Sequence, residues 1–411
     1  MWRYKLLLFL VLIPLVFYTL WQSFRALEFR YFLQRLALSF NSNIKPNGIW
    51  IHTASVGEVN AVIPLIQKIH EEKPELPITL SSNTTTSAAV AKQQLPENIQ
   101  HCYFPLDYSW MVKRLINKIK PQSIFIVETE FWPNLYTQAN KKNIPLMIIN
   151  GRISEKTLHA KNWLKNIYAE ILPLVAKVYA RSETDQSRFI ELGLDKNKIE
   201  VLGNIKFSAP SQQDITPINL NRPYVLAAST REDEEQIIVE AWLKSERRNH
   251  LLVIVPRHPK RLSDILSQLK PFKLNISVRS KNEQVTDTTD IYLADTIGEL
   301  KQFIAGSDFV LMGGSFVEKG GHNILEVAQL GKAVVFGPDM SNFKDEADMF
   351  IQYNAGIQCI KEALPDVFNQ LLENNDYKSE LEKNTHKLIK ENNNVNKYYK
   401  ILLSHTINQK I

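Results

Sequence analysis

The stretch GIWIHTASVGEVNAVIPLIQKI, residues 48–69, predicts the fold of this chain. Residues 48–52 form a short run of mostly apolar side chains, which is typical of a buried strand. From Val59 to Ile69 the apolar residues recur with helical spacing. A buried strand followed by a helix is the first half of a βαβ unit, so we expect a parallel sheet with helices on both faces.

The same alternation continues along the chain. Apolar runs are separated by segments with helical patterns, and such spacing is typical of strands joined by crossovers within one parallel sheet. We therefore predict one doubly wound, Rossmann-like domain over residues 48–208. Its further strands are expected at 78–81, 124–127, 146–149 and 178–180.

A break in the pattern follows. The segment SAPSQQDITPINLNRP, residues 208–223, has three prolines and no periodic apolar pattern, so 209–223 is predicted to be a linker. A second Rossmann-like domain is expected over 224–360, and residues 361–411 are expected to form C-terminal helices that pack on either domain. The two domains should face a cleft, because open α/β sheets bind ligands at the carboxyl ends of their strands. Strands of the second domain are expected at 224–228, 251–255, 291–293, 309–312 and 333–336.

Composition excludes several classes of protein. With 44% hydrophobic and 22% charged residues, the 411-residue chain is neither disordered nor a multi-spanning membrane protein. Its two cysteines, Cys102 and Cys359, are too few for a disulfide scaffold or a cysteine zinc site and fit a reducing compartment. Five of the six net positive charges fall in residues 1–48. We therefore expect no nucleic-acid partner, because a nucleic-acid-binding domain would carry its surplus charge on the folded body.

The amino-terminus carries the sequence LLLFLVLIPLVFYTLW, residues 6–21, which contains no charge. As a helix it would reach about 24 Å, against ~30 Å for a bilayer core, so a short span and a deep interfacial anchor both fit. A secretory signal peptide is the alternative, but no small-x-small cleavage site follows. An aromatic and basic amphipathic run covers residues 24–40. Residues 1–47 are thus predicted to attach the chain to an anionic membrane surface, with the body in the cytoplasm.

Two acidic motifs follow predicted strands of the first domain. In Thr53-Ala54-Ser55-Val56-Gly57-Glu58, the glutamate falls in the first turn of a helix and faces the expected cleft, although Ser55-x-x-Glu58 is also a capping-box pattern. In ETEFWPN, residues 128–134, the paired carboxylates could bind a metal, stabilise a developing cation or cap the next helix. Metal binding is the least favoured, because an isolated E-x-E supplies too few ligands and the nine histidines show no paired ligand spacing.

The second domain carries motifs suited to a nucleotide. The segment VPRHP, residues 255–259, ends a strand with a guanidinium that can bind phosphate. Gly313-Gly314-Ser315 ends another strand, and KGGHN, residues 319–323, leads into a helix that carries Glu326. Glycines let a backbone approach an anion closely, and a carboxylate can accept from ribose hydroxyls.

These motifs together resemble those of the 3-deoxy-D-manno-octulosonic acid (Kdo) transferases, which add Kdo to lipid A precursor. The resemblance covers nearly the whole chain, in family order. The matching stretches are SVGE at 55–58, ETEFWPNL at 128–135, NGRIS at 150–154, GNIKF at 203–207, STRE at 229–232, VPRHP at 255–259, DTIGEL at 295–300 and GGSFVEKGGHNILE at 313–326.

The resemblance implies a glycosyltransferase of the two-Rossmann GT-B architecture at the cytoplasmic face of the inner membrane, using CMP-Kdo and lipid A precursor without metal or cofactor. It implies that Glu58 is the proton acceptor and that Glu128 and Lys206 stabilise the transition state. The sequence departs from the family pattern at Asn323-Ile324, where a proline is usual, at Asp233 and in SSNTTTS at 81–87. The implied CMP-binding residues are Pro256, Arg257, Ile297, Gly298, Glu299, Asn323, Ile324, Leu325 and Glu326.

Two other functions stay open from the residues alone. One is a membrane-associated GT-B enzyme that uses a UDP-sugar, and the other is a nucleotide-binding membrane scaffold without catalysis. Binding of CMP rather than UDP separates the first from a Kdo transferase, and product formation excludes the second.

Overall fold

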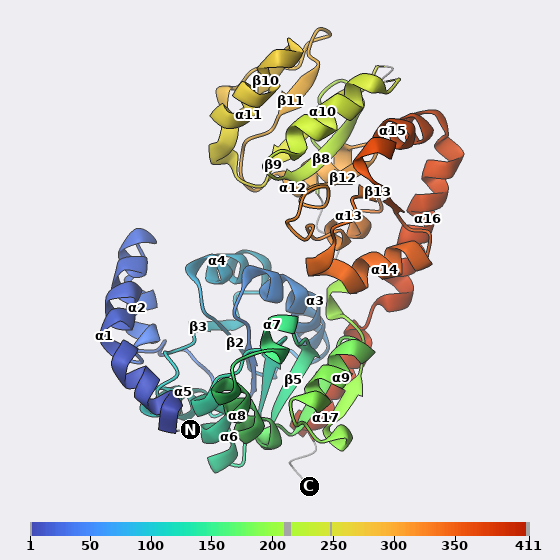
Figure 1. Cartoon of the computed structure of the whole chain (residues 1–411). Coiled ribbons are helices and arrows are strands. Elements are labelled where there is room, and N and C mark those ends of the chain that lie inside the picture. Colours follow the sequence, from blue (N-terminus) through green and yellow to red (C-terminus); the bar gives the residue numbers. More distant parts are fainter. Residues whose placement is uncertain (1, 209–214, 247–248, 408–411) are drawn as a thin grey trace. The chain divides into compact units, whose positions relative to one another are not determined.

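The computed structural model describes residues 2–208, 215–246 and 249–407. The chain divides into two compact units, each built on its own sheet (Figure 1). Unit 1 comprises residues 1–208 and 393–411, and unit 2 comprises residues 209–392.

Unit 1 contains a seven-stranded sheet in the order β3-β2-β1-β4-β5-β6-β7, with every neighbouring pair parallel. The strand order reverses between β1 and β4, which is the position where doubly wound sheets hold their ligands. The strands are β1 Ile49–His52, β2 Ile78–Ser82, β3 Gln100–Tyr103, β4 Ser123–Val127, β5 Leu146–Gly151, β6 Lys177–Ala180 and β7 Ile199–Val201.

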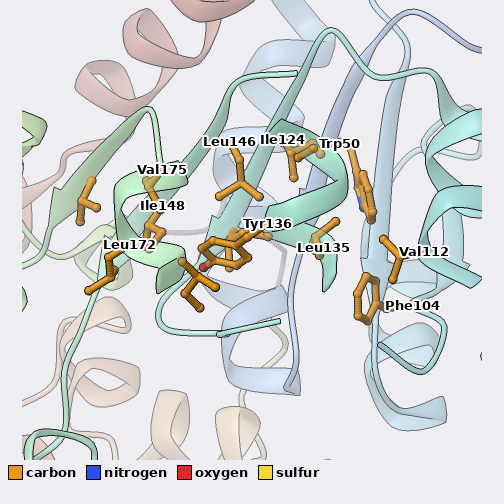
Figure 2. Packing of buried hydrophobic residues seen from close by; sticks show 14 of the residues in the cluster. Trp50, Phe104, Val112, Ile124, Leu135, Tyr136, Leu146, Ile148, Leu172 and Val175 are labelled. Atoms are coloured by element: carbon orange, nitrogen blue, oxygen red, sulfur yellow. The ribbon is translucent and has the colours of Figure 1, made fainter. Parts of the chain in front are cut away.

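Both faces of this sheet are covered by helices. Alternate residues of β1 point to opposite sides, so Trp50 joins one core and Ile49 and Ile51 join the other. Figure 2 shows the first core, where Trp50 and Phe104 lie near Leu135 and Tyr136 of α6. The helices of unit 1 are α1 Trp2–Arg25, α2 Phe29–Arg35, α3 Val56–Glu72, α4 Thr85–Gln94, α5 Ser109–Ile119, α6 Pro133–Lys141, α7 Glu155–Leu158, α8 Asn162–Ile171, α9 Glu183–Glu191 and α17 Val395–Ile407.

The two ends of the chain are built into unit 1. On α17, Tyr398 and Leu402 are fully buried in the core that contains α3. At the other end, α2 closes the edge of the sheet, because Gln34 Oε1 accepts the Tyr103 N–H of edge strand β3 at 2.8 Å. Of the helices in residues 361–411, α15 (Leu364–Glu373) and α16 (Asn375–Asn392) belong to unit 2, and α17 belongs to unit 1.

Unit 2 repeats the architecture with the order β10-β11-β9-β8-β12-β13-β14, again parallel throughout. Its strands are β8 Tyr224–Thr230, β9 Leu251–Pro256, β10 Ile276–Val278, β11 Ile291–Leu293, β12 Val310–Met312, β13 Val334–Phe336 and β14 Ile357–Gln358. Its other helices are α10 Glu234–Lys244, α11 Leu262–Leu269, α12 Leu300–Gly306, α13 Leu325–Gln329 and α14 Lys344–Gln352. The predicted α/β class with two doubly wound parallel sheets is thus confirmed.

Candidate active site

Glu58 lies in the first turn of α3, shortly after β1, and its carboxylate takes part in a cap close to the capping box that its spacing allows. Ser55 is the N-cap and its Oγ accepts the Glu58 N–H at 3.3 Å. In return, Glu58 Oε1 accepts from the Ser55 hydroxyl at 2.9 Å and Oε2 accepts the Ala54 N–H at 2.7 Å. The carboxylate therefore closes the helix end, as one of the two interpretations of the sequence expects.

The same carboxylate also lines a pocket at the carboxyl edge of the sheet. This pocket has a volume of about 260 Å³ and lies where β1 and β4 end. Glu58 is only 7% exposed. Because it lines this pocket, a ligand bound in the pocket could contact its carboxyl group. The lining residues are Glu58, Glu128, Thr129, Glu130, Arg152, Ser154 and Thr157. Glu58 therefore both caps α3 and lines the pocket.

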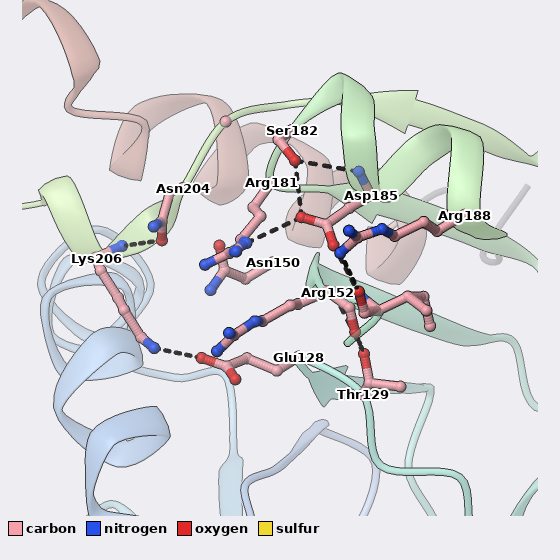
Figure 3. Close-up of polar contacts among 12 residues, drawn as sticks. Glu128, Thr129, Asn150, Arg152, Arg181, Ser182, Asp185, Arg188, Asn204 and Lys206 are labelled. Atoms are coloured by element: carbon pink, nitrogen blue, oxygen red, sulfur yellow. Dashed lines mark hydrogen bonds and ion pairs between the residues drawn. The ribbon is translucent and has the colours of Figure 1, made fainter. Parts of the chain in front are cut away.

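Glu128 follows β4 and forms an ion pair with Lys206, whose Nζ lies 2.5 Å from Glu128 Oε1 (Figure 3). The backbone of Glu128 has φ +59°, a conformation that side chains of this size adopt rarely. The Glu128 N–H nevertheless donates to Ile149 O on β5 at 2.9 Å, so the residue stays attached to the sheet. Such strained positions concentrate at functional sites, where the surrounding structure holds them.

The loop that carries Lys206 is tied to the end of β5. Asn204 Oδ1 accepts the Lys206 N–H at 3.0 Å, and Asn150 Oδ1 accepts the Ile205 N–H at 3.1 Å. Asn150 is fully buried, so its side chain fixes this loop rather than contacting solvent. Residues predicted from two distant motifs, Glu128 and Lys206, are thereby brought together.

Burial changes the acidity of the pocket carboxyls. The pKa of Glu58 is raised to about 8, chiefly by desolvation and also by the charges of Glu128 and Glu130, while hydrogen bonds from Ala54 and Ser55 partly oppose the increase. Desolvation likewise raises the pKa of Glu130 to about 7, with Glu128 adding to the effect. A carboxylate with a raised pKa is a stronger base than an ordinary glutamate and can accept a proton near neutral pH.

The pocket is also lined by residues to which the sequence motifs assign no role, namely Arg152, Ser154 and Thr157. Buried Asp185 holds their loop, because its Oδ1 accepts the Ile153 N–H at 2.7 Å. Its Oδ2 accepts from Arg181 Nε at 2.9 Å and the Ser182 hydroxyl at 2.8 Å (Figure 3). The NGRIS stretch at 150–154 was the signal available in the sequence, since it follows a predicted strand.

In unit 2, Arg257 follows β9 beside other cationic and imidazole side chains. Arg231, which follows β8, places Nη1 2.8 Å from His258 Nε2 and donates from Nε to His322 Nε2 at 3.3 Å. The pKa of His322 is lowered to about 4, chiefly by burial and also by the charges of Arg231, Arg257 and His258. This cluster is suited to an anionic group, and sequence reasoning had assigned only Arg257 to it.

A buried acid shapes the glycine loop next to this cluster. Glu234, at the start of α10, accepts the backbone N–H groups of Ser315 at 3.0 Å, Phe316 at 2.9 Å and Arg231 at 2.9 Å. A side chain at Gly313 would place Cβ 2.6 Å from Ser229 O, so the close approach of the loops after β8 and β12 requires glycine there.

The other residues predicted to bind CMP lie at the end of β9 and in the segments that follow β11 and β12. Ile297 is 88% exposed, Gly298 has φ +95°, and Glu299 pairs with Arg279 at 2.5 Å. Glu299 and Arg279 line a polar pocket of about 620 Å³ together with Tyr292 and Thr296. Pro256 is the last residue of β9, a strand that pairs directly with β11. Because β9, β11 and β12 are parallel strands of one sheet, all of these segments leave it at the same edge.

Residues 323–326 begin helix α13. Asn323 Nδ2 donates to Glu326 Oε1 at 3.3 Å, and Asn323 Oδ1 accepts the Leu325 N–H at 3.2 Å. Ile324 and Leu325 are buried, so they can offer a ligand their backbone and not their side chains. Within the described residues, no group of three or more His, Cys, Asp or Glu side chains is arranged to hold a metal ion.

Comparison with known proteins places these motifs in a family. Residues 30–209 match the family model described as 3-deoxy-D-manno-octulosonic-acid transferase (kdotransferase). The 3-deoxy-D-manno-octulosonic acid transferase of Haemophilus influenzae is 34% identical over 317 residues, covering 75% of this chain and 74% of the relative. The transferase of the same name from Bordetella pertussis is 30% identical over 331 residues, covering 75% of this chain and 76% of the relative.

Solved structures support the fold. The crystal structure of UDP-GlcNAc 2-epimerase from Neisseria meningitidis bound to UDP-GlcNAc matches 88% of this chain and 100% of that chain, with a TM-score of 0.59 at 13% identity. This likeness shows the two-Rossmann GT-B type of fold and nothing about substrate. The sequence comparisons confirm the resemblance drawn from the motifs: the chain belongs to the Kdo transferase family and is a glycosyltransferase.

Proposed function

We propose that this protein transfers Kdo from CMP-Kdo to a hydroxyl of the lipid A precursor, lipid IVA, with inversion at the anomeric carbon. One observation carries the proposal. The Glu58 carboxyl lines a pocket beside the Glu128–Lys206 ion pair, and burial raises its pKa to about 8. A carboxyl group suited to accept a proton therefore lines the same pocket as Glu128, the acidic member of this ion pair.

In the proposed reaction, Glu58 accepts the proton of the attacking acceptor hydroxyl. The oxygen of that hydroxyl forms a bond to the anomeric carbon of Kdo as the bond from that carbon to the CMP phosphate oxygen breaks. A single displacement of this kind inverts the anomeric configuration. Positive charge develops on the sugar ring, and negative charge develops on the departing phosphate.

Charged side chains can stabilise both developing charges. The Glu128 carboxylate favours the electron-poor sugar, while Lys206, which pairs with Glu128, can attract the leaving phosphate. On unit 2, Arg257, Arg231 and the start of α13 offer cationic groups and backbone N–H groups to the CMP phosphate. The proposal assigns the role of a divalent cation to these groups, so the reaction proceeds without metal.

A lipid acceptor explains why the enzyme would need a membrane anchor. A glycolipid exposes its sugar and phosphates only shallowly at a membrane surface, so the enzyme must work close to that surface. Helix α1 is 24 residues long and apolar enough to associate with a bilayer. We place the protein at the cytoplasmic face of the inner membrane on this basis, together with the basic charge of residues 1–48.

The direct test is product formation by the full-length protein. It is incubated with CMP-Kdo and tetra-acylated lipid A precursor, and the lipid is weighed by mass spectrometry. The expected products are heavier by one or more Kdo residues, with CMP released and with no loss of product after chelation of divalent cations. In parallel, CMP should raise the melting temperature and UDP should not. Consumption of a UDP-sugar without consumption of CMP-Kdo would overturn the proposal.

A further inference from the structure

Helix α1 is attached to unit 1 along its whole length. In its first turn, the Tyr4 hydroxyl donates to Asp107 Oδ2 at 2.8 Å. One turn later, the Tyr108 hydroxyl donates to Leu8 O at 2.5 Å. In its last turn, Ser23 is buried and its hydroxyl donates to Glu28 O at 2.8 Å. Tyr4 to Ser23 spans about 28 Å of helix axis, nearly the ~30 Å thickness of a bilayer core.

The middle of the helix is attached as well. Leu15 and Val16 pack against a small apolar cluster formed by Leu36, Ala37, Leu106 and Met111. Thr19, one turn further, is only 1% exposed. The packed side of α1 therefore includes Tyr4, Thr19 and Ser23, all of them polar.

The opposite side of α1 is apolar and exposed. Phe9 is 74% exposed, Ile13 68% and Phe17 67%. This distribution is the reverse of a helix on a water-soluble protein, which turns its polar side outward. We call this side, with the exposed apolar residues next to it, the apolar face. Its members are Trp2, Leu6, Leu7, Phe9, Leu10, Ile13, Phe17, Tyr18, Trp21, Phe24, Leu27, Phe29, Leu38 and Trp110.

The last four of these residues lie outside α1. Leu27 is 93% exposed, Phe29 58%, Leu38 49% and Trp110 53%. Trp110 lies on α5, one residue before Met111, which packs in the cluster that receives α1. Exposed apolar residues are therefore also present on α2 and α5 and just after α1 and α2, and Leu38 and Trp110 are chain neighbours of Ala37 and Met111 in the cluster that packs on α1.

Cationic side chains accompany the apolar face. Arg3 and Lys5 are exposed at one end of α1 and Arg25 at the other. On α5, exposed Arg114 donates from Nη2 to Leu38 O at 3.1 Å, which places its guanidinium beside an exposed apolar residue. An apolar band bordered by Lys, Arg and Trp matches the boundary between the acyl chains and the anionic headgroups of a bilayer.

We propose that α1 lies in the plane of an anionic membrane leaflet, with the apolar face in the acyl boundary, and does not cross the bilayer. A crossing α1 would carry the residues attached to it into the hydrocarbon, including buried Asp107 and the exposed Lys113 and Arg114. An in-plane α1 leaves these groups at the headgroups. This inference rests on the membrane attachment proposed above and makes unit 1 a part of the membrane-binding surface.

Topology labelling tests the orientation. Single variants Arg3→Cys and Arg25→Cys are made in a Cys359→Ser background, with buried Cys102 left in place. A membrane-impermeant maleimide is applied to inverted inner-membrane vesicles and to intact spheroplasts. The expected result is labelling of both positions in inverted vesicles and of neither in spheroplasts. Labelling of position 3 in spheroplasts alone would overturn the proposal.

Vesicle flotation tests the part of the apolar face outside α1. Trp110→Ser should weaken binding to phosphatidylglycerol-containing vesicles roughly fivefold or more, because a large half-exposed apolar side chain is lost from the lipid contact. The matched control is Ile190→Ser on α9, where a 41% exposed isoleucine lies outside the apolar face. It should leave binding unchanged.

Unchanged vesicle binding of Trp110→Ser would contradict the proposal. So would a wild-type protein that sediments as a dimer and does not bind vesicles. The second outcome would mean that a second copy covers the apolar face. Neither measurement depends on Kdo transfer, and an unchanged far-ultraviolet circular dichroism spectrum and melting temperature of each variant verify folding. Failure of the orientation is therefore distinguishable from failure of the proposed reaction.

Discussion

The Tyr398 hydroxyl, on the last helix of the chain, donates a hydrogen bond to the Gly203 carbonyl at 2.9 Å. The same hydroxyl accepts the Asn150 N–H at 3.2 Å. Gly203 lies three residues before Lys206, and Asn150 holds the intervening loop through its side chain. The C-terminal helix α17 thus supports the position of a proposed catalytic lysine.

Replacing this hydroxyl tests the support. Tyr398→Phe leaves the buried Asn150 N–H without its acceptor, which costs about 1–3 kcal/mol of unfolding free energy. We expect turnover to fall several-fold while CMP affinity is unchanged, because the nucleotide is assigned to unit 2. The control is Tyr399→Phe on the same helix, which should lower stability less and leave turnover unchanged. Equal turnover of the two variants would contradict a positioning role for Tyr398.

Lys206 itself should affect the chemical step. Lys206→Met removes the cation that lies 2.5 Å from Glu128 Oε1. We expect turnover to fall by roughly 10²- to 10³-fold, as for other groups that stabilise charge in a transition state. CMP titration should give an unchanged dissociation constant. Loss of CMP binding with normal turnover at saturation would instead assign Lys206 to the donor.

The pH dependence of turnover reports on Glu58. A proton acceptor must be ionised, and burial raises the pKa of Glu58 to about 8, so kcat/KM should rise with pH to a plateau above about 8. Glu130→Gln removes one charge that raises this pKa, and the rising limb should move to lower pH. The control Glu155→Gln, which changes an exposed side chain on α7, should leave the limb in place. An unshifted limb in Glu130→Gln would contradict the assignment.

The same shift has a consequence for stability. The pKa of Glu58 is higher in the folded state than its ordinary value, so the unfolded chain releases this proton at lower pH. The contribution of Glu58 to the free energy of unfolding should therefore decrease as pH rises between the ordinary value and about 8. Chemical denaturation of wild type and Glu58→Gln across this range should show a flatter dependence in the variant. If the free energy of unfolding depended on pH equally in wild type and Glu58→Gln, this would contradict the raised pKa of Glu58.

Nucleotide binding should be coupled to protonation of His322. Burial and neighbouring cations lower the pKa of His322 to about 4, and an anion bound beside Arg231 and Arg257 would raise it. We expect CMP binding near pH 5.5 to take up a proton, seen by calorimetry as a binding enthalpy that changes with the ionisation enthalpy of the buffer. His322→Asn should abolish that change. A wild-type enthalpy independent of buffer would contradict the placement of the phosphate.

The sequence predicted the strands that have strong apolar runs and missed those that do not. Edge strands β3 (QHCY), β7 (IEV), β10 (ISV) and β14 (IQ) are short, and each contains a polar residue. An edge strand has one neighbour and partial exposure, so it needs no continuous apolar run. The buried strands β1, β4 and β8 do need one, which explains why they were predicted.

The closeness of Glu58 and Glu128 was predictable because each of their motifs follows a strand. Glu58 and Glu128 come shortly after β1 and β4, which are neighbours in the sheet, so strand pairing alone brings them together. The contributions of Asp185 and Tyr398 depend on contacts between distant segments that no local pattern records. The sequence also could not predict which side of α1 packs on unit 1. That side carries the polar residues Tyr4, Thr19 and Ser23 beside Leu15 and Val16, so it is no more apolar than the exposed side.

The turnover of Glu58→Gln compared with Ser55→Ala tests the central claim most directly. Glutamine retains an oxygen that can accept hydrogen bonds at the helix end but cannot accept the proton of the acceptor hydroxyl, whereas Ser55→Ala weakens the cap and keeps the base. With CMP-Kdo and lipid A precursor, we predict that Glu58→Gln loses roughly 10²- to 10⁴-fold in turnover with CMP binding intact, while Ser55→Ala stays within a few-fold of wild type. Near-normal turnover of Glu58→Gln would show that Glu58 only caps α3.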